Sequence, residues 1–424
     1  MATTEPDRKK QFGSLLRLSA GIVGLVAVLG ALVINARAGY SSWLTARVAA
    51  DEAAISVLDT ALRLDPWNGR AYDVRARSFL SIGKTAEAVK DFETAVRLRP
   101  HDYLFWLRLG YSRAKLGDHD GARSAYAMSL RLAPNYGRPH WYMGTLLVKM
   151  RLHEDAFAEF RSAIAADEDY FPHVVNTAWR QFHGDAAAVE RAIQPRNPSE
   201  RLALARVFLD HGKSVEAVNL FRTTGPDVIA ERDALVADLL SAKQFVSAYD
   251  LWTSATTDRS ALTKIVNGDF ENPIDEGNSG FGWRLAQGLE RVSAVHDLQQ
   301  PNSGASSLLL DFSGRSNPST EIISQVIVVQ ARTRYRLNFA ARTENLVTGG
   351  LPMIVITDAG DGRVLAQSQT LPAWSGKWQP YSVELTTSDN TEAVVVVVKR
   401  QACSSSPCPA FGRVWVDSFF FSAN

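Results

Sequence analysis

The sequence predicts a multidomain protein in which a single N-terminal transmembrane helix precedes an all-α solenoid and then an all-β sandwich. Three observations predict it. An uncharged apolar run lies near the N-terminus, a 34-residue repeat fills the middle of the chain, and short alternating segments with turn signals fill the remainder. At 424 residues the chain is also too long for one ordinary hydrophobic core.

The apolar run occupies residues 18–36, and the polar residues 1–17 before it carry four Lys or Arg side chains. As a helix the run is about 28 Å long, enough to cross the core of a bilayer. The basic flank predicts a cytoplasmic tail over residues 1–17, with the rest of the chain on the outer side. Two alternatives stay open. Ala36, Arg37 and Ala38 match a signal-peptide cleavage site, and the run could also be a buried helix of a soluble protein.

The repeat in the middle of the chain is marked by Pro66, Pro100 and Pro134, which stand 34 residues apart. Small and aromatic residues recur at fixed places between these prolines. Such a period is typical of stacked helix–turn–helix units, because small residues let paired helices approach closely. The recurring positions are Tyr72 and Trp106; Ala76, Gly110 and Gly144; Ala88, Ala122 and Ala156; and Phe92, Tyr126 and Phe160.

This pattern resembles the tetratricopeptide repeat over residues of about 40–258, most closely at 69–168. Arg113 departs from it, because a second aromatic residue is expected there. The resemblance implies a solenoid whose first helices line a groove that binds a protein partner. The residues that match the repeat most closely are Trp106, Leu109, Gly110, Ala122, Tyr126 and Pro134. The groove positions carried over are Arg70, Arg77, Tyr111, Lys115, Arg138 and Trp141, with Asp73, Leu107, Lys149 and Arg206 as further positions.

The groove residues are mainly basic and aromatic. Such a set would suit an acidic peptide or an acidic polymer, through charge-assisted hydrogen bonds and ring contacts. The alternative interpretation is a solvated helix face with some packed aromatic residues.

Helical periodicity stops after Arg259, and residues 263–424 read as short alternating strands separated by Gly, Pro, Asn and Asp clusters. This arrangement predicts a β-sandwich. The continuous apolar run from Val394 to Val398 predicts a strand that is buried on both faces. The predicted strands are Ser307–Phe312, Ile322–Val329, Tyr335–Ala341, Met353–Thr357, Val364–Leu371, Tyr381–Thr386, Ala393–Lys399 and Arg413–Phe421.

Several phrases of this domain, in order, resemble a second family, the carbohydrate-binding modules of the galactose-binding-like fold. They are residues 266–271 followed by Trp283, then residues 335–339, 376–381 and 414–418. The resemblance implies a jelly-roll sandwich that binds a glycan. The same fold also serves as a spacer or as a protein-binding module.

Sugar binding needs exposed aromatic faces flanked by polar groups. Trp283 and Tyr381 match positions that usually pack the sandwich, whereas Trp374 lies in a loop. The resemblance also implies a structural calcium ion between Glu271 and Asp417, although Ser418 stands where a further Asp is usual. The glycan-contact candidates are Trp374, Trp283, Tyr381, Gln325 and Arg342.

The remaining composition narrows the class of protein. Lys and Arg number 46 and Asp and Glu 45, a balance that argues against nucleic-acid binding. Cys403 and Cys408 are too few for a cysteine zinc site, but they could form a disulfide in an oxidising compartment. The sequence contains no phosphate-binding loop, metalloprotease or serine-hydrolase motif, so we expect no enzyme and no catalytic cofactor.

These features together predict a non-enzymatic, membrane-anchored scaffold of the bacterial envelope. It would pass once through the inner membrane, with the bulk of the chain in the periplasm. The repeats would bind a protein and the sandwich a glycan, in exopolysaccharide assembly or export. The alternative is a pure protein–protein scaffold without sugar binding.

Overall fold

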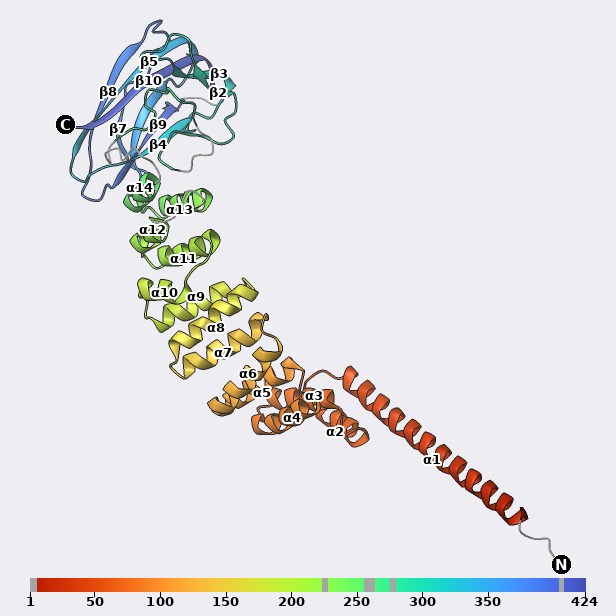
Figure 1. Ribbon diagram of the computed structural model, residues 1–424. Helices are drawn as coiled ribbons and strands as arrows, with labels where there is room; N and C mark the ends of the chain where they lie inside the picture. The colour runs from red at the N-terminus through yellow and green to blue at the C-terminus, as the bar shows by residue number, and fades with distance from the viewer. Residues whose placement is uncertain (1–5, 223–227, 255–263, 275–279, 404–407) are drawn as a thin grey trace, which may run out of the picture. The chain divides into compact units, whose positions relative to one another are not determined.

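The computed structural model describes residues 6–222, 228–254, 264–274, 280–403 and 408–424, and for residues 6–21 the backbone alone. The chain divides into two compact units, Met1–Gln194 and Pro195–Asn424, which are described separately. The described part of the first unit is helical, and the second combines helices with two β-sheets (Figure 1).

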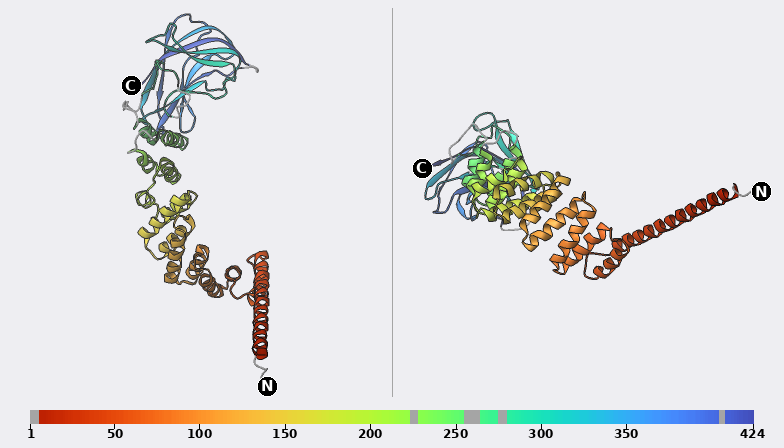
Figure 2. Two further views of the ribbon diagram at one scale, coloured as in Figure 1. Left: turned by 45° about the vertical axis from the view of Figure 1, so that its right-hand side comes forward. Right: turned by 60° about the horizontal axis from the view of Figure 1, so that its bottom comes forward.

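The helices of the first unit follow one another as antiparallel pairs. Each pair packs on the next in sequence order, and the views in Figures 1 and 2 agree on this stacking. The helices are α1 (Pro6–Arg47), α2 (Ala54–Leu64), α3 (Gly69–Ser81), α4 (Thr85–Leu98), α5 (Tyr103–Leu116), α6 (His119–Leu132), α7 (Gly137–Lys149), α8 (His153–Ala166), α9 (Tyr170–Gln181) and α10 (Ala186–Ile193).

Local signals explain where these helices begin and end. Asn68, Asp102 and Asp118 precede α3, α5 and α6, and each side chain accepts a hydrogen bond from a backbone N–H of the first turn. Gly117 ends α5 in the left-handed conformation, with φ of 85°, which glycine adopts without strain. These caps allow very short turns, between successive pairs at Asn68 and Asp102 and within a pair at Asp118.

The small residues of the repeat let the two helices of a pair pack closely. A Cβ added to Gly110 of α5 would lie 2.5 Å from the Tyr126 ring of α6. A Cβ added to Gly144 of α7 would lie 2.6 Å from the Phe160 ring of α8. Both rings are almost fully buried, so the 34-residue period places a glycine against an aromatic ring in two successive pairs.

The first helix, α1, is unbroken from Pro6 to Arg47 (Figure 2) and passes through Ala36–Ala38 without interruption. Among the described residues it is the one helix long and apolar enough to cross a membrane, over Ile22–Arg47, in which an 18-residue window has a mean hydropathy of 2.0. Ser41 and Thr45 near its end are buried against the following helices. The end of α1 is therefore also the first helix of the first pair.

The described part of the second unit begins with two further helix pairs and continues with ten strands in two sheets. The helices are α11 (Pro198–Asp210), α12 (Ser214–Arg222), α13 (Ile229–Ser241) and α14 (Phe245–Thr253). The strands are β1 (Arg284–Leu285), β2 (Val292–Asp297), β3 (Ser307–Arg315), β4 (Ile323–Val328), β5 (Arg334–Thr348), β6 (Pro352–Asp358), β7 (Val364–Gln367), β8 (Gln379–Thr386), β9 (Ala393–Arg400) and β10 (Pro409–Ala423).

The two sheets are antiparallel, with five strands each, in the orders β1-β4-β9-β6-β7 and β2-β3-β10-β5-β8. Alternate side chains of both sheets form one hydrophobic core, which includes Tyr335, Ile354 and Val396. β9 lies between β4 and β6, and most of Val394–Val398 is buried, as the apolar run predicted.

The longest strands, β5 and β10, pair along most of their length and shift register twice. One shift lies at Gly412, which has φ of 107° and whose added Cβ would lie 2.3 Å from the Asn345 carbonyl oxygen. A bulge of this kind requires glycine, because both the backbone angle and the space exclude a side chain.

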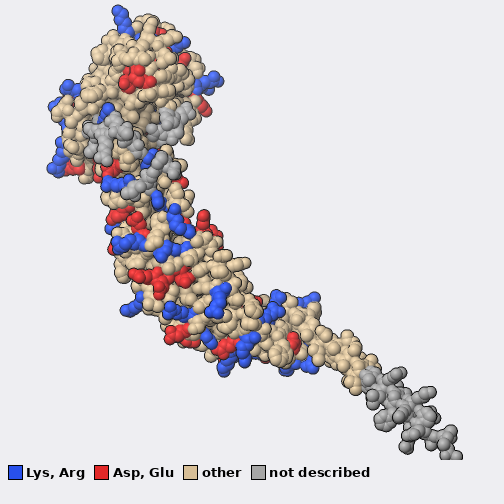
Figure 3. Space-filling view, in the orientation of Figure 1, with Lys and Arg blue, Asp and Glu red and all other residues tan. Residues whose placement is uncertain are grey.

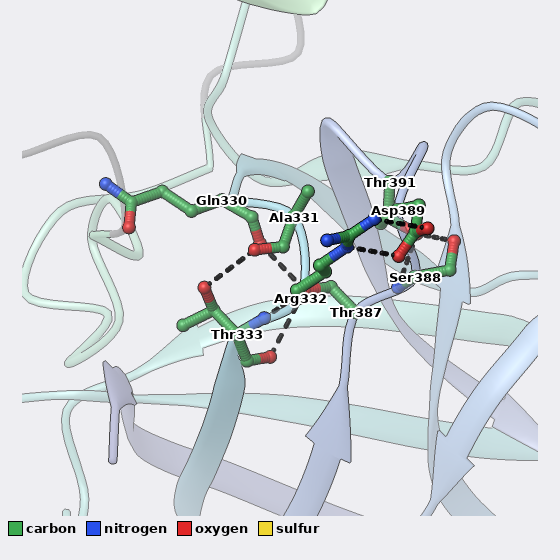
Figure 4. Close-up of polar contacts among 8 residues, drawn as sticks. All are labelled: Gln330, Ala331, Arg332, Thr333, Thr387, Ser388, Asp389 and Thr391. Atoms are coloured by element: carbon green, nitrogen blue, oxygen red, sulfur yellow. Dashed lines mark hydrogen bonds and ion pairs between the residues drawn. The ribbon is translucent and has the colours of Figure 1, made fainter.

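Side-chain hydrogen bonds fasten the connections at one end of the sandwich (Figure 4). The Thr387 hydroxyl donates to the Gln330 carbonyl and accepts from the Thr333 backbone N–H. Arg332 and Asp389 form a two-point ion pair at the same place, with both side chains exposed. The β4–β5 and β8–β9 connections are therefore held together.

Candidate functional site

The first helices of the repeats carry the predicted partner-binding residues. On each of α3, α5 and α7 these residues are three, four or seven positions apart, a spacing that puts them on one helix face. Arg77 and Trp141 are half-buried, and the other members are exposed. We call this set the first-helix surface, and it consists of Arg70, Arg77, Tyr111, Lys115, Arg138 and Trp141.

Two residues that were expected beside this set are buried instead. Asp73 and Leu107 are 2% and 3% exposed. The Asp73 carboxylate accepts hydrogen bonds from Arg77 at 3.3 Å and from Arg108 at 2.5 Å. Asp73 therefore offers nothing to a partner, and it neutralises part of the positive charge of Arg77.

The aromatic members of the first-helix surface are held by other rings. The Trp141 ring stacks on Tyr170 of α9 at 5.5 Å and contacts Phe160 of α8 at 5.1 Å. The Tyr111 ring of α5 makes an edge contact with Tyr142 of α7 at 5.9 Å. These rings bridge successive helix pairs, so the aromatic residues serve packing and leave only part of each ring for a partner.

Charge on the helical repeats is mixed. On the face drawn in Figure 3, Lys and Arg alternate with Asp and Glu along the helices and do not form one field of a single sign. The stretch of α1 next to the grey residues is tan, in agreement with its uncharged sequence. Attraction of an acidic partner would therefore depend on local groups such as Lys115 and Arg138.

His140 in the first turn of α7 lies between two acceptors. Its Nδ1 is 2.6 Å from a Glu159 carboxylate oxygen, and its Nε2 is 2.9 Å from the Pro134 carbonyl oxygen. An imidazolium has two N–H donors and satisfies both acceptors. The Glu159 hydrogen bond accordingly raises the pKa of His140; burial opposes this shift and the Pro134 carbonyl adds to it. Trp106, one repeat earlier, donates in the same way to the Pro100 carbonyl at 2.8 Å.

The raised pKa of His140 predicts a pH-dependent stability. A group whose pKa is higher in the folded state stabilises that state below its unfolded pKa of about 6.5, and this contribution is lost as the pH rises through the folded value. Relative to H140Q, the wild type should lose about 1 kcal/mol of unfolding free energy across that window. Urea unfolding followed by circular dichroism over a pH series measures the difference, and parallel profiles would contradict it.

Two of the predicted glycan contacts lie inside the sandwich. Trp283 is 2% exposed and packs on Phe270 at 5.4 Å, while its indole N–H donates to the Asn267 carbonyl. Gln325 is 1% exposed and exchanges two hydrogen bonds with the backbone of Val266. Neither side chain presents a face or a polar group to solvent, and this corrects their prediction as glycan contacts.

Two other candidates are placed between core and surface. Tyr381 is half-buried and stacks on Phe339 at 5.2 Å. Arg342 is 8% exposed; its guanidinium lies 4.0 Å above the Trp415 ring and donates to the Gln300 side chain. The cation–π contact between Arg342 and Trp415 stabilises the sheet. It leaves little of either side chain accessible to a ligand.

Trp374 is the candidate that remains accessible, with 61% of its surface exposed. The Ala373 carbonyl accepts from the Leu346 N–H, so this loop lies against β5. The next residue of β5, Val347, pairs with Phe411 of β10, and these side chains are 68% and 47% exposed. We call these three exposed apolar side chains, which lie on or next to this part of β5, the Trp374 patch: Val347, Trp374 and Phe411. Phe411 was missed because it lies just before the predicted strand Arg413–Phe421.

The predicted calcium residues both hold one loop. The Asp417 carboxylate, which is fully buried, accepts from the backbone N–H groups of Asn302 and Ser303. Glu271 accepts from the backbone N–H groups of Ala305 and Ser306. Burial raises the pKa of Asp417, and the N–H groups partly offset that shift. Backbone N–H groups donate to both Asp417 oxygens and to Glu271 Oε1. The described residues contain no group of three or more His, Cys, Asp or Glu that could hold a metal ion, and calcium takes six to eight oxygen ligands, so the site does not fit this ion.

Cys403 and Cys408 are joined by a disulfide, with their Cα atoms 6.1 Å apart. Arg400, which is 2% exposed, lies beside this bridge. Its guanidinium donates to the carbonyl oxygens of Gly350, Ser316 and Cys408. A single buried side chain therefore holds three segments together around the disulfide.

The second unit also contains a cavity that the sequence did not indicate. Its volume is about 920 Å³, and its lining includes Leu240, Phe245, Leu285 and Val326. Arg284 also lines it, and burial lowers the pKa of this guanidinium, which donates to a backbone carbonyl. The lining residues come from separate segments, so no local motif marks the cavity.

Comparison with known proteins identifies the repeats. The model of the tetratricopeptide repeat family matches residues 74–137. This stretch runs from α3 to the first residue of α7 and includes the Gly110–Tyr126 contact. The chain therefore contains tetratricopeptide repeats, a module that typically binds other proteins.

The tetratricopeptide repeat and J domain-containing co-chaperone DNJ1 of Fusarium oxysporum f. sp. lycopersici is 36% identical over 76 residues. These residues are 18% of this chain and 15% of the co-chaperone, so the match spans a small part of both proteins. A crystal structure of MamA protein is 16% identical, covers 37% of this chain and 84% of its own, and has a TM-score of 0.32. The MamA RS-1 ArsTM double mutant is 16% identical, covers 41% and 96%, and has a TM-score of 0.33.

Proposed function

We propose that this protein is a non-enzymatic, membrane-anchored scaffold. α1 holds it in the bacterial inner membrane with the bulk of the chain in the periplasm, the repeats bind a protein and the sandwich binds a glycan. The observation that carries the proposal is the continuity between one exposed apolar helix and the tetratricopeptide repeats. The helix runs unbroken through the signal-peptidase-like residues Ala36–Ala38, which favours a retained anchor.

The protein partner in this proposal presents an acidic segment to the first-helix surface. Arg70, Lys115 and Arg138 are exposed cations, and among the described contacts none of them has a carboxylate partner. Arg77, in contrast, already pairs with Asp73. Charge-assisted hydrogen bonds from the exposed cations, with Tyr111 beside them, are the chemistry that would recognise carboxylates.

Reversing two of these charges tests the protein-binding half. The full chain with K115E and R138E should bind its partner about 10–100-fold more weakly, because two attractive contacts become repulsive. Partners are identified by cross-linking in cells and mass spectrometry, and affinity is then measured with the purified partner. The control is K90E with R123E, which makes the same charge change at exposed positions of α4 and α6. If the partner still binds the K115E and R138E protein but not the K90E and R123E protein, the binding surface lies on the second helices, such as α4 and α6.

The glycan-binding half depends on the Trp374 patch, whose exposed rings and aliphatic side chain could stack on a sugar. An exopolysaccharide or another envelope glycan is the ligand class, and its assembly or export is the process. Affinity electrophoresis of the full chain in gels containing neutral or acidic polysaccharides tests this. W374A should remove the retardation, and W67A, which removes an exposed tryptophan of the first unit, should keep it.

A chain that stays folded and is retarded by no polysaccharide would favour the alternative, a pure protein scaffold whose sandwich docks another protein. The proposal includes no cofactor. It leaves calcium out because backbone N–H groups already donate to both Asp417 oxygens and to Glu271 Oε1, which leaves too few oxygens for this ion.

A further inference from the structure

Three large aromatic side chains are exposed where α1 leaves its apolar stretch. Tyr40, Trp43 and Trp67 are 52%, 46% and 78% exposed. The Tyr40 and Trp43 rings stack at 5.5 Å, and the Arg47 guanidinium lies 4.3 Å above the Trp43 ring. Tyrosine and tryptophan with an apolar body and a polar end are enriched at the boundary between lipid tails and water.

Side-chain hydrogen bonds fix the turn that carries Trp67 to α1. The Asn68 amide donates to the hydroxyls of Ser41 at 3.0 Å and Thr45 at 3.3 Å, and both hydroxyl residues are buried. One turn lower on α1, the Arg37 guanidinium donates to the Arg63 carbonyl at 3.2 Å. The first helix pair therefore continues the apolar helix without a flexible linker.

The helix rise gives the height of these side chains above the apolar run. At 1.5 Å per residue, Tyr40 and Trp43 lie about 4 and 9 Å beyond Arg37, and the Ser41–Thr45 level that holds Asn68 lies about 6–12 Å beyond it. The headgroup layer on each side of a bilayer is about 5–8 Å thick. An apolar run that fills the hydrocarbon core therefore places Tyr40 and Trp43 in or at the edge of the headgroup layer, with Trp67 at its outer boundary.

We propose that the membrane-proximal end of the first helix pair contacts the bilayer, with Tyr40 and Trp43 inserted in the phospholipid headgroup layer and Trp67 at its outer boundary. The inference rests on the proposed membrane anchor and adds a second contact to it. Arg37 and Arg63 are both exposed and lie beside each other at the end of the apolar run. In this placement their guanidinium groups face the lipid phosphates. This contact fixes the direction in which the repeats leave the membrane.

The test uses a fluorescent label beside Trp67 in the full chain. Pro66→Cys is exposed and can be labelled with an environment-sensitive dye, because the described native cysteines are joined in a disulfide. Pro100→Cys and Pro134→Cys are exposed controls at the equivalent positions of the next two repeats. Each protein is reconstituted in phosphatidylcholine vesicles with or without brominated lipids, and vesicle flotation is recorded.

The label at residue 66 should shift to the blue and be quenched by brominated lipid, whereas labels at residues 100 and 134 should show neither change. Adding W67A to the Pro66→Cys protein should reduce the quenching. Flotation with no quenching at residue 66 would overturn the inference and leave the anchor intact, as would equal quenching at all three positions. A chain that does not float with vesicles would instead refute the anchor itself.

Discussion

Replacing Gly144 by alanine is expected to lower the unfolding free energy of the repeats by about 2–3 kcal/mol. The added Cβ would lie 2.6 Å from the Phe160 ring and 3.0 Å from the Ala156 carbonyl oxygen. The ring is fully buried and the carbonyl belongs to the backbone of α8, so neither can move without displacing the helix. Alanine favours the helical state by about 1 kcal/mol over glycine, which is too little to offset this overlap.

Urea unfolding of the full chain in detergent, followed by helical circular dichroism, measures this loss. The control is G39A, because an added Cβ at that helical position of α1 meets no atom within 4 Å. G39A should leave the transition unchanged or raise it slightly. Equal transitions for G144A and G39A would show that the α7–α8 pair opens at no cost, contrary to the packing described here.

Replacing Arg400 by leucine is expected to cost about 4 kcal/mol of unfolding free energy in the sandwich. Its guanidinium is buried and donates to the carbonyl oxygens of Gly350, Ser316 and Cys408 and to the Thr348 hydroxyl. Leucine would remove all of these donors from a buried site, and of the four acceptors the Gly350 carbonyl and the Thr348 hydroxyl would keep a hydrogen bond to each other's residue. Each acceptor that is left without a donor costs about 1–3 kcal/mol, and relaxation recovers part of the sum.

Thermal unfolding is monitored by near-ultraviolet circular dichroism, to which the packed aromatic residues of the sandwich and of the repeats both contribute. R400K should fall between wild type and R400L, because lysine keeps the charge and lacks the planar set of donors. R332L removes an exposed arginine from the same domain and serves as the control with an unchanged midpoint. If R400L and R332L unfold alike, the network around Arg400 does not stabilise the domain.

The predicted order, helical repeats followed by a β region, is confirmed, and the β region has two sheets. The helical part could be predicted because its 34-residue period is visible in the sequence. Pro100 and Pro134 mark the ends of helices, and Gly110 and Gly144 mark close helix contacts. These features depend on backbone angles and steric exclusion, which few other residue types satisfy.

Strand ends were less predictable. β5 extends to Thr348 although four polar residues, Arg342–Asn345, interrupt the alternating pattern, because pairing with β10 continues beyond them. β1 has two residues and is too short to leave a pattern. Its place in the sheet depends on pairing with β4, a contact between residues 38–40 positions apart.

The candidate sites also divide into residues whose position follows from the local sequence and residues whose position depends on distant partners. The exposure of Trp374 could be predicted, because a tryptophan in a Pro- and Gly-containing loop has no core to enter. Sequence reasoning misplaced Gln325, since nothing in the local sequence shows that this amide pairs with the Val266 backbone. It also placed Asp73 on a surface, where Arg108, 35 residues away, instead holds it inside. Long-range polar pairing is invisible to a helical or strand period.

The unbroken path of α1 into the first helix pair has a mechanical consequence. A transmembrane helix tilts to match the thickness of the bilayer around it. Because Asn68 ties the next turn directly to α1, any such tilt would rotate the first helix pair by the same angle. The lipid composition, which sets the thickness of the bilayer, would then change the direction in which the first repeats point.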